Sequence, residues 1–406
     1  PRSPEFRPAP VRREKREEPR ELMNRAIVLG AGRVGRAIAF DLAALEGWQV
    51  TVADRSSTAL HRVRARPPVQ GITADLSDSE ELQASIRDQD LVVGALPSFL
   101  GYQALRSVIR TGKPYVDLSF FEEDPFPLQA MAEDHGAVAV VDCGIAPGLD
   151  NLLLGHLLDR LDEVRSFVCL VGGLPESRTL PWEYKAPFAP YDVLAEYTRP
   201  ARIVESGRKV TVPALSDRKL YDFDEVGTLE GFLTDGLRTL LRTVDVSHME
   251  ERTLRYPGHA EKIVLLRDSG LLDPDPVEID GVEISPLAVT STQLLPHWEL
   301  DPEETDLTLL RVVVTGREGE EWQRHTYELS DRRDPETGLS SMARTTGFTC
   351  TAIAGLVAEG ILEEPGLYAP EHLGPLPGAL ESVLAHLADR GIELRHEIET
   401  INPPVA

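Results

Sequence analysis

Basic residues are scarce in this chain compared with acidic ones. Its 406 residues include 42 Lys and Arg against 67 Asp and Glu, which gives a formal net charge of −25. Proteins that bind a nucleic-acid backbone need clustered cations to release counterions, so we expect no nucleic-acid partner. For the same reason, an anionic cofactor has to be held by local backbone groups rather than by a general positive field.

Cysteines and long apolar runs are also scarce. The cysteines, Cys143, Cys169 and Cys350, are far apart and odd in number, which favours a reducing, cytoplasmic location. No CxxC pair, HExxH motif or His/Cys cluster has ligand spacing, so we expect no metal site. No apolar run approaches the ~20 residues that cross a bilayer, and we expect no membrane association. Residues 1–22, rich in proline and charge, are expected to form a disordered tail.

The chain from Arg25 to Val141 alternates short β-branched runs with helical patterns. The strand candidates are RAIVLG, WQVTVAD, VQGITAD, DLVVGAL, PYVDLSF and AVAVVDCG. Amphipathic stretches such as Gly35–Leu45 and Ser79–Ile86 lie between them. This alternation predicts an α/β domain with a doubly wound parallel sheet over residues 23–148. A helical pattern in MARTTGFTCTAIAGLVAEGIL suggests that residues 340–406 pack back and complete this domain.

Residues 149–339 have a different pattern. Their strand candidates are longer and more polar, as in SFVCLVGG, LTLLRVVVTG and QRHTYELS. This pattern predicts a second, α+β domain on a mostly antiparallel sheet, which would bind the substrate. Exposed edges of such a sheet would suit pairing with a second copy, so we expect a homodimer.

The most informative motif is IVLGAGRVGRAIAFDLA, from Ile27 to Ala43. Gly30-x-Gly32-x-x-Gly35 follows a strand and opens a helix, which is the context of a Rossmann-type dinucleotide site. The glycines permit a tight turn, close approach of a pyrophosphate and close helix–strand packing, and the helix N-terminus attracts the phosphates. Asp54 ends the second strand at the spacing of a carboxylate that binds a ribose 2′-hydroxyl.

Asp54 favours NAD, because a carboxylate there repels a 2′-phosphate. Arg55 beside it could turn toward such a phosphate, so NADP stays open as the less expected cofactor. Asp75 either approaches the adenine or caps a helix, and the turn after the fourth strand should adjoin the nicotinamide. The residues expected to bind the cofactor are Gly30, Gly32, Arg33, Val34, Gly35, Asp54, Arg55, Asp75, Ala95, Leu96 and Pro97.

Several stretches together resemble the saccharopine dehydrogenase-like family. They are GAGRVG, GALPSF, DCGIAPGLDN, GGLP and MARTTGFTCTAIAG, while FDEVGTLEGFLTDGLRTLL and TLRYPGHAEKI are most similar to its lysine 6-dehydrogenase branch. The resemblance implies NAD-dependent oxidative deamination of the ε-amine of L-lysine to allysine, which cyclises to piperideine-6-carboxylate. A saccharopine-type reductase that uses NADP is the alternative within the family.

The candidate substrate residues follow from the chemistry of an amine. Hydride loss from a C–N centre needs a base and a dry site. Asp117, Asp142 and His259 are candidate catalytic groups, although each could instead cap a turn or pack in the core. Arginine can grip a carboxylate with its fork, and an ion pair at the surface is the alternative role. The candidate substrate-binding residues are Glu122, Lys185, Thr234, Arg238 and Arg255.

A function of another class also fits the sequence. The chain could be a binding protein that senses dinucleotides and has lost turnover. A sensor needs no convergent polar groups in its second domain, whereas TDGLRTLL and YPGH suggest such a group of residues.

Overall fold

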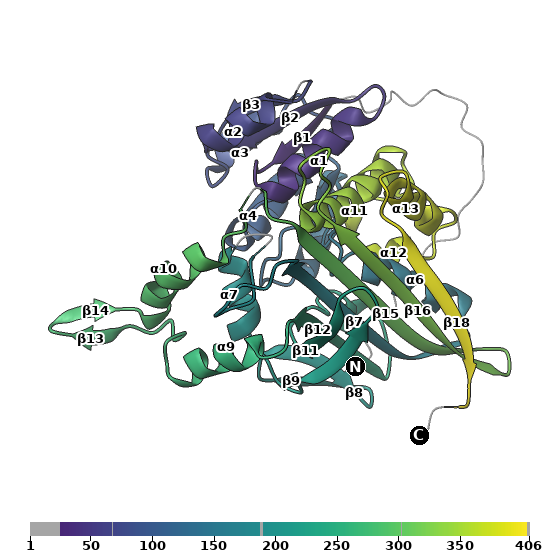
Figure 1. The fold of residues 1–406 in the computed structure, drawn as a ribbon. Helices are drawn as coiled ribbons and strands as arrows, with labels where there is room; N and C mark the ends of the chain where they lie inside the picture. The colour runs from purple at the N-terminus through teal and green to yellow at the C-terminus, as the bar shows by residue number, and fades with distance from the viewer. Residues whose placement is uncertain (1–24, 67, 187–189, 302, 404–406) are drawn as a thin grey trace.

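The computed structural model describes residues 25–66, 68–186, 190–301 and 303–403, so the predicted tail at 1–22 lies outside the described residues. Two large sheets organise the chain, one above the other in Figure 1. The strands of the upper sheet come from residues 25–140 and from one late strand, and those of the lower sheet lie between residues 163 and 401. This arrangement confirms the predicted fold class.

Among the described residues, the first sheet has seven strands in the order β17-β6-β5-β4-β1-β2-β3, all parallel to their neighbours. Its strands are β1 (Arg25–Leu29), β2 (Gln49–Asp54), β3 (Gln70–Thr73), β4 (Leu91–Gly94), β5 (Tyr115–Asp117), β6 (Val138–Val140) and β17 (Gly366–Tyr368). The chain reverses direction across the sheet between β1 and β4, which is where ligands bind in folds of this kind.

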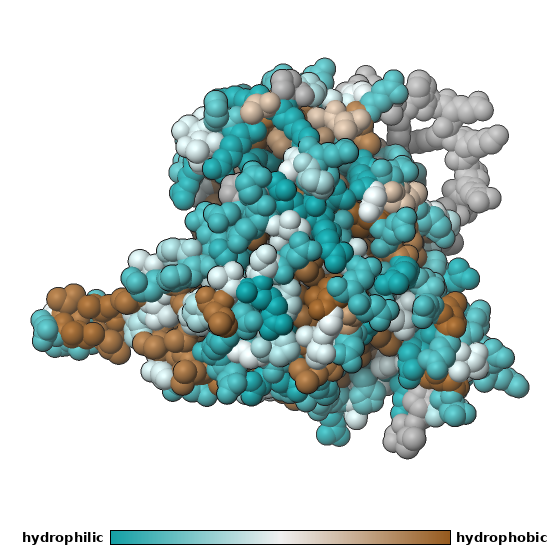
Figure 2. Space-filling view, viewed as in Figure 1, coloured by the Kyte–Doolittle hydropathy of each residue, from teal (hydrophilic) through white to brown (hydrophobic). Residues whose placement is uncertain are grey.

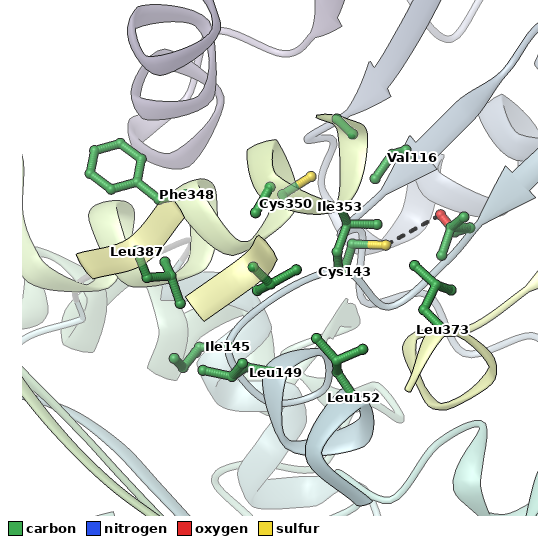
Figure 3. Packing of buried hydrophobic residues seen from close by; sticks show 14 of the residues in the cluster. Val116, Cys143, Ile145, Leu149, Leu152, Phe348, Cys350, Ile353, Leu373 and Leu387 are labelled. Carbon is green, nitrogen blue, oxygen red and sulfur yellow. Dashed lines mark hydrogen bonds between the residues drawn. The ribbon is translucent and has the colours of Figure 1, made fainter. Parts of the chain in front are cut away.

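Helices cover both faces of this sheet because its strands are apolar on both sides. Ala26 and Val28 of β1 pack with α1 (Arg33–Ala44), α2 (Ser57–Arg64) and α11 (Ser341–Ala358). Ile27 and Leu29 face the other way, toward α3 (Ser79–Ile86), α4 (Ser98–Ile109) and α5 (Gln129–His135), with the short 3₁₀ turn η1 (Phe126–Leu128) before α5. Figure 3 shows α11 from the C-terminal part inserting Cys350 and Ile353 beside Val116 of β5.

The second sheet is mixed and has nine strands in the part of the chain that the structure describes. Its main path is β10-β11-β12-β7-β15-β16-β18, and a ribbon of β8 and β9 joins at β12. Only β7 and β12 run parallel among these pairs. The strands are β7 (Glu163–Pro175), β8 (Ala201–Glu205), β9 (Arg208–Val212), β10 (Lys219–Phe223), β11 (Gly227–Leu233), β12 (His248–Arg255), β15 (Asp306–Glu318), β16 (Glu321–Arg332) and β18 (Leu394–Ile401).

The helices of this half lie around the second sheet. α6 (Leu149–Arg160) leads into β7, and α7 (Pro190–Thr198), α8 (Leu240–Thr243), α9 (His259–Asp268) and α10 (Pro286–Trp298) follow. A hairpin of β13 (Val277–Ile279) and β14 (Val282–Ile284) projects from the body, and its exposed apolar side chains are brown in Figure 2. The predicted homodimer stays a prediction.

The C-terminal segment crosses between the two halves. α11 packs on α1, and β17 extends the first sheet, while the predicted domain bounds stay a prediction. After α12 (Pro370–Leu373), helix α13 (Ala379–Ala388) is tied to α1 by a bond of 2.9 Å between His386 and Asp41. The last strand, β18, differs from the expected division, because it pairs with β16 in the second sheet. In the described part of the chain, no helix is long and apolar enough to cross a membrane.

Candidate functional site

A cavity of about 950 Å³ lies between the two halves of the chain. One wall is the carboxyl edge of the first sheet, with the glycine turn and the ends of β2, β4 and β5. The opposite wall is formed by β7, β12, α7 and the end of α10. All eleven residues expected to bind the cofactor line this one cavity, although their roles remain predictions.

The glycine turn has the geometry that a close-approaching ligand needs. Gly30 has φ +108°, and a Cβ at Gly35 would lie 2.1 Å from the carbonyl oxygen of Gly30. These two glycines therefore close the turn. A Cβ at Gly32 would meet no atom within 4 Å, so this residue faces the open cavity just before α1 begins. The residues present fit a dinucleotide whose phosphates lie against Gly32 and the helix N-terminus.

Asp54 joins the glycine turn to the end of β2. Its carboxylate oxygens accept hydrogen bonds of 2.7 Å from the backbone N–H groups of Ala31 and Ser56. The carboxylate is therefore fixed at the edge of the cavity, with further lone pairs for a ribose hydroxyl. Asp75, the other carboxylate here, accepts from the N–H and hydroxyl of Ser77, and Asp78 rather than Asp75 caps α3.

The turn after β4 is held by a buried carboxyl group. The Ser119 hydroxyl donates to Asp117 at 2.7 Å and accepts from the Leu96 N–H at 3.3 Å. Ser119 and Leu96 line the cavity, whereas Asp117 lies behind them and is fully buried. Burial raises the pKa of Asp117 to about 7. The structure thus places this candidate base where it supports the turn instead of meeting a substrate.

The second wall is built by alternate residues of β12. Because side chains alternate across a strand, Glu251, Thr253 and Arg255 share one face, and all three line the cavity. The Thr234 hydroxyl donates to Glu251 at 2.5 Å and contacts the Thr253 hydroxyl at 2.8 Å. Thr234 is thus the one predicted substrate residue, apart from Arg255, that the structure places on this wall.

Glu251 carries a carboxyl group with unusual surroundings. The residue is 4% exposed, and among the described residues no lysine or arginine forms an ion pair with it. Gly236 leaves room for this group, since a Cβ there would lie 2.5 Å from the Glu251 carboxyl carbon. Burial raises the pKa of Glu251 to about 8, and the nearby Glu196 acts in the same direction. A buried carboxyl without a cation can bind a cation or accept a proton.

One face of α7 completes the site. Asp192 and Glu196 of α7 and Arg199, which directly follows the helix, are spaced at helical intervals, and all line the cavity. The Ser98 hydroxyl donates to Asp192 at 2.7 Å, which connects the first residue of α4 to α7. Arg199 pairs with Glu122 at 2.7 Å. These bonds span the two halves of the cavity and hold its walls together.

The other candidate residues lie away from the cavity lining. Asp142 and Arg238 form a buried ion pair at 2.9 Å, so this guanidinium is already occupied. His259 is fully buried behind Arg255, and burial lowers its pKa to about 3, which makes it unsuitable as a base near neutral pH. Glu122 is an exposed partner of Arg199. Lys185 donates to the Glu299 carbonyl oxygen at 2.9 Å. The structure therefore does not bring these five residues together at the site.

Glu251, Thr253 and Glu196 were missed by the sequence analysis, although weak signals for them exist. The first two are separated by one residue, Arg252, in EERTLR, which is the spacing of neighbours on one face of a strand. Glu196 follows Asp192 at the i, i+4 spacing of a helix. Both spacings occur on many solvated surfaces, so they indicate a site only once the opposite wall is known.

Comparisons with known proteins agree with this architecture. Residues 26–140 match the family model described as "Saccharopine dehydrogenase NADP binding domain", and residues 144–392 match "Saccharopine dehydrogenase C-terminal domain". The chain belongs to the saccharopine dehydrogenase family. It is thus a dehydrogenase with a pyridine-nucleotide-binding domain, and the predicted family resemblance is confirmed.

Three matches are distant in sequence but cover more than nine-tenths of this chain. Saccharopine dehydrogenase [NADP(+), L-glutamate-forming] from Saccharomyces cerevisiae is 27% identical, over 91% of this chain and 98% of the relative. Carboxyaminopropylagmatine dehydrogenase from Synechocystis is 21% identical, over 94% and 99%. The structure of apo saccharopine dehydrogenase (L-Glu forming) from S. cerevisiae has a TM-score of 0.75 at 22% identity and covers 93% of this chain and 100% of its own. The last comparison supports the fold.

Proposed function

We propose that this chain oxidises the C–N bond of a cationic amine with a pyridine nucleotide, and that its substrate is the ε-amine of L-lysine. The observation that carries this proposal is Glu251, a buried carboxyl group on the cavity wall that lacks a cationic partner among the described residues. An ammonium group of a substrate would supply the missing cation. The same carboxylate can then accept a proton from that group.

The residues of this chain divide the chemistry between the two walls. A bound nicotinamide would supply the acceptor for a hydride from the carbon that carries the amine. Gly32 and Asp54 would hold the cofactor's phosphate and ribose, and Ser119 and Leu96 hold the turn that would adjoin the nicotinamide. Glu251 removes the proton from the amine nitrogen, while Thr234 orients the carboxylate. The product imine hydrolyses to allysine, which cyclises to piperideine-6-carboxylate.

NAD is the proposed cofactor, and Asp54 supports it. Its carboxylate is fixed at the ribose end of the site and would repel a 2′-phosphate. The opposite preference has support as well, since the matched domain model and the yeast relatives are named for NADP and Arg55 lies beside Asp54 on the cavity surface. A direct comparison of the two cofactors decides between them.

A saccharopine-type reaction is the second candidate. The names of relatives that cover more than nine-tenths of this chain favour it. The charges of the site oppose it, because saccharopine carries three carboxylates and each needs a cation once water is excluded. Arg199 and Arg255 line the cavity, but each already pairs with a carboxylate of the chain. Arg199 pairs with Glu122, and Arg255 pairs with Glu196.

The test is a spectrophotometric assay at 340 nm with NAD or NADP and a panel of L-lysine, L-ornithine and saccharopine. We expect reduction of NAD with L-lysine and at most weak turnover of saccharopine. Faster turnover of saccharopine than of lysine would contradict the lysine assignment and support the second candidate. Binding of dinucleotide without any turnover across the panel would support the sensor function.

A further inference from the structure

Arg255 is held by the protein on nearly every side. It is 2% exposed, and its Nε donates to the Tyr197 hydroxyl at 2.9 Å. One terminal nitrogen donates to the Leu254 carbonyl oxygen at 2.9 Å, and the other to Glu196 at 3.1 Å and the Tyr184 hydroxyl at 3.4 Å. Four of its five N–H groups therefore have partners within the chain. This geometry suits a fixed support better than a fork that opens to grip a substrate.

The hydrogen bonds that hold Arg255 continue through Tyr197 to His259. His259 Nδ1 lies 3.0 Å from the Trp182 carbonyl oxygen, which can only accept, so Nδ1 carries the proton. Nε2 then accepts from the Tyr197 hydroxyl at 3.0 Å. The Tyr197 oxygen in turn accepts from Arg255. In this row of hydrogen-bonded residues, His259–Tyr197–Arg255, every donor therefore has one acceptor. Because the row admits a single arrangement of protons, it fixes the position of the guanidinium.

Glu196, the ion-pair partner of Arg255, lies where this row of residues adjoins the cavity. Its side chain is 23% exposed, whereas the Arg255 side chain beside it is 2% exposed. Both residues line the cavity, and Glu196 is near enough to Glu251 to raise that group's pKa. The guanidinium also lies 4.5 Å from the centre of the Tyr184 ring, and the face of an aromatic ring attracts a cation. An incoming ligand therefore meets the carboxylate of this ion pair first.

We propose that the row His259–Tyr197–Arg255 positions the Glu196 carboxylate to bind a second cationic group of the substrate, in addition to the amine at Glu251. The inference rests on the proposed function and names its substrate class: compounds with two cationic nitrogens. For L-lysine, Glu251 receives the ε-amine and Glu196 the α-ammonium. Glu196 contacts the substrate, and the other three are positioning residues. His259, a candidate base from the sequence, has its role at the far end of this row.

Two substrates that differ by one amine test the proposal. L-Lysine has the α-amine, and 6-aminohexanoate lacks it, so the ratio of their kcat/KM values measures binding at Glu196. A hydrogen bond to a charged group is worth roughly 10- to 100-fold in affinity, so Glu196→Gln should lower this ratio by at least about tenfold. Tyr197→Phe removes one hydroxyl of the row and should lower the ratio by about two- to tenfold. A purely structural defect would lower both kcat/KM values together and leave the ratio unchanged.

Tyr256→Phe is the matched control. Tyr256 follows Arg255, and its hydroxyl donates to the Pro175 carbonyl oxygen at 2.9 Å, outside the row. Loss of this hydroxyl should leave the ratio of the two kcat/KM values as it is in the unmodified protein. An unchanged ratio in Glu196→Gln, or equal ratios in Tyr197→Phe and Tyr256→Phe, would overturn the inference.

A second readout separates this inference from the proposed function. If the unmodified protein oxidises neither substrate, the proposed function fails. Calorimetric titration of the NADH-bound protein with the same two compounds then tests the inference alone. Tighter binding of lysine than of 6-aminohexanoate, lost in Glu196→Gln, supports it. Equal binding of the two compounds by the unmodified protein overturns it.

Discussion

At the scale of single residues, the decisive group is the Glu251 carboxyl. As a base it must be deprotonated, and burial raises its pKa to about 8. Its protonated form dominates below that pH, so kcat/KM for lysine should rise as the pH increases through about 8. Glu251→Gln should lower kcat by about 10²- to 10⁴-fold and remove this titration from the pH profile. A variant that retains both the rate and the titration would show that another group is the base.

The same carboxyl group links activity to stability. Between its ordinary pKa of 4.5 and about 8, the folded protein keeps a proton that the unfolded chain releases. Stability therefore falls as the pH rises through this window, because the native state binds more protons. Glu251→Gln cannot titrate, so its Tm relative to the unmodified protein should increase from pH 5 to pH 8. Thermal unfolding at several pH values measures this difference, and a constant difference would contradict it.

Asp54 is the residue that tests the cofactor. Asp54→Ala should weaken NAD binding by about 1–3 kcal/mol, since it removes a carboxylate that can bond the ribose, and it should relax discrimination against NADP. Arg55→Ala, at the neighbouring position, is the matched control and should change the affinity for NADP alone. Dissociation constants for both cofactors follow from fluorescence titrations. A preference of the unmodified protein for NADP would show that the interpretation of Asp54 as an NAD determinant is wrong.

At the scale of elements, two glycines of the turn have different roles, because Gly35 matters for folding and Gly32 for dinucleotide binding. Gly35→Ala places a Cβ 2.1 Å from the Gly30 carbonyl oxygen, so we expect a loss of about 1–3 kcal/mol in stability. Gly32 has extended backbone angles and open space around it, so Gly32→Val should fold normally. Its side chain would occupy the space of the phosphates and abolish dinucleotide binding. Thermal unfolding and titration with NAD distinguish the two variants, and retained affinity in Gly32→Val would rule out this turn as the phosphate site.

The first domain could be predicted from sequence because its signals are local. Five of its first six strands are short, mostly apolar runs, with β3 (QGIT) as the exception, and the glycine motif fixes the junction of β1 and α1. The second wall of the cavity could not be predicted in this way. Glu251 and Glu196 lie 55 residues apart in sequence and come near one another because Tyr197 and Glu196 of α7 bond to Arg255 of β12. Arg238 gave an equally strong pattern and pairs with Asp142 instead. Charge in a sequence does not reveal which partner already neutralises it.

At the scale of the whole molecule, the first domain depends on the C-terminal segment. α11 packs on α1, its first N–H groups are bound by Asp306 of β15, and β17 pairs with β6. A fragment of residues 25–140 would expose the apolar surfaces that α11 covers, so it should not fold cooperatively. Joining it by a flexible linker to residues 340–373 should restore a cooperative transition. Circular dichroism during thermal unfolding measures both fragments, and a cooperative transition in the shorter one would contradict this dependence.

The net charge of −25 acts on both ligands in opposite directions. L-Lysine carries one net positive charge and should be attracted to the protein, whereas an anionic dinucleotide should be repelled. Salt screens both effects, since the Debye length falls from about 30 Å at 0.01 M to about 8 Å at 0.15 M. Over this range, kcat/KM for lysine should fall while the association rate constant of NAD rises. Stopped-flow and steady-state measurements in the same buffers check both trends. If both constants moved in the same direction, the field of the whole molecule would not govern the encounter, and local groups such as Glu196 and Glu251 would have to account for selection of the cation.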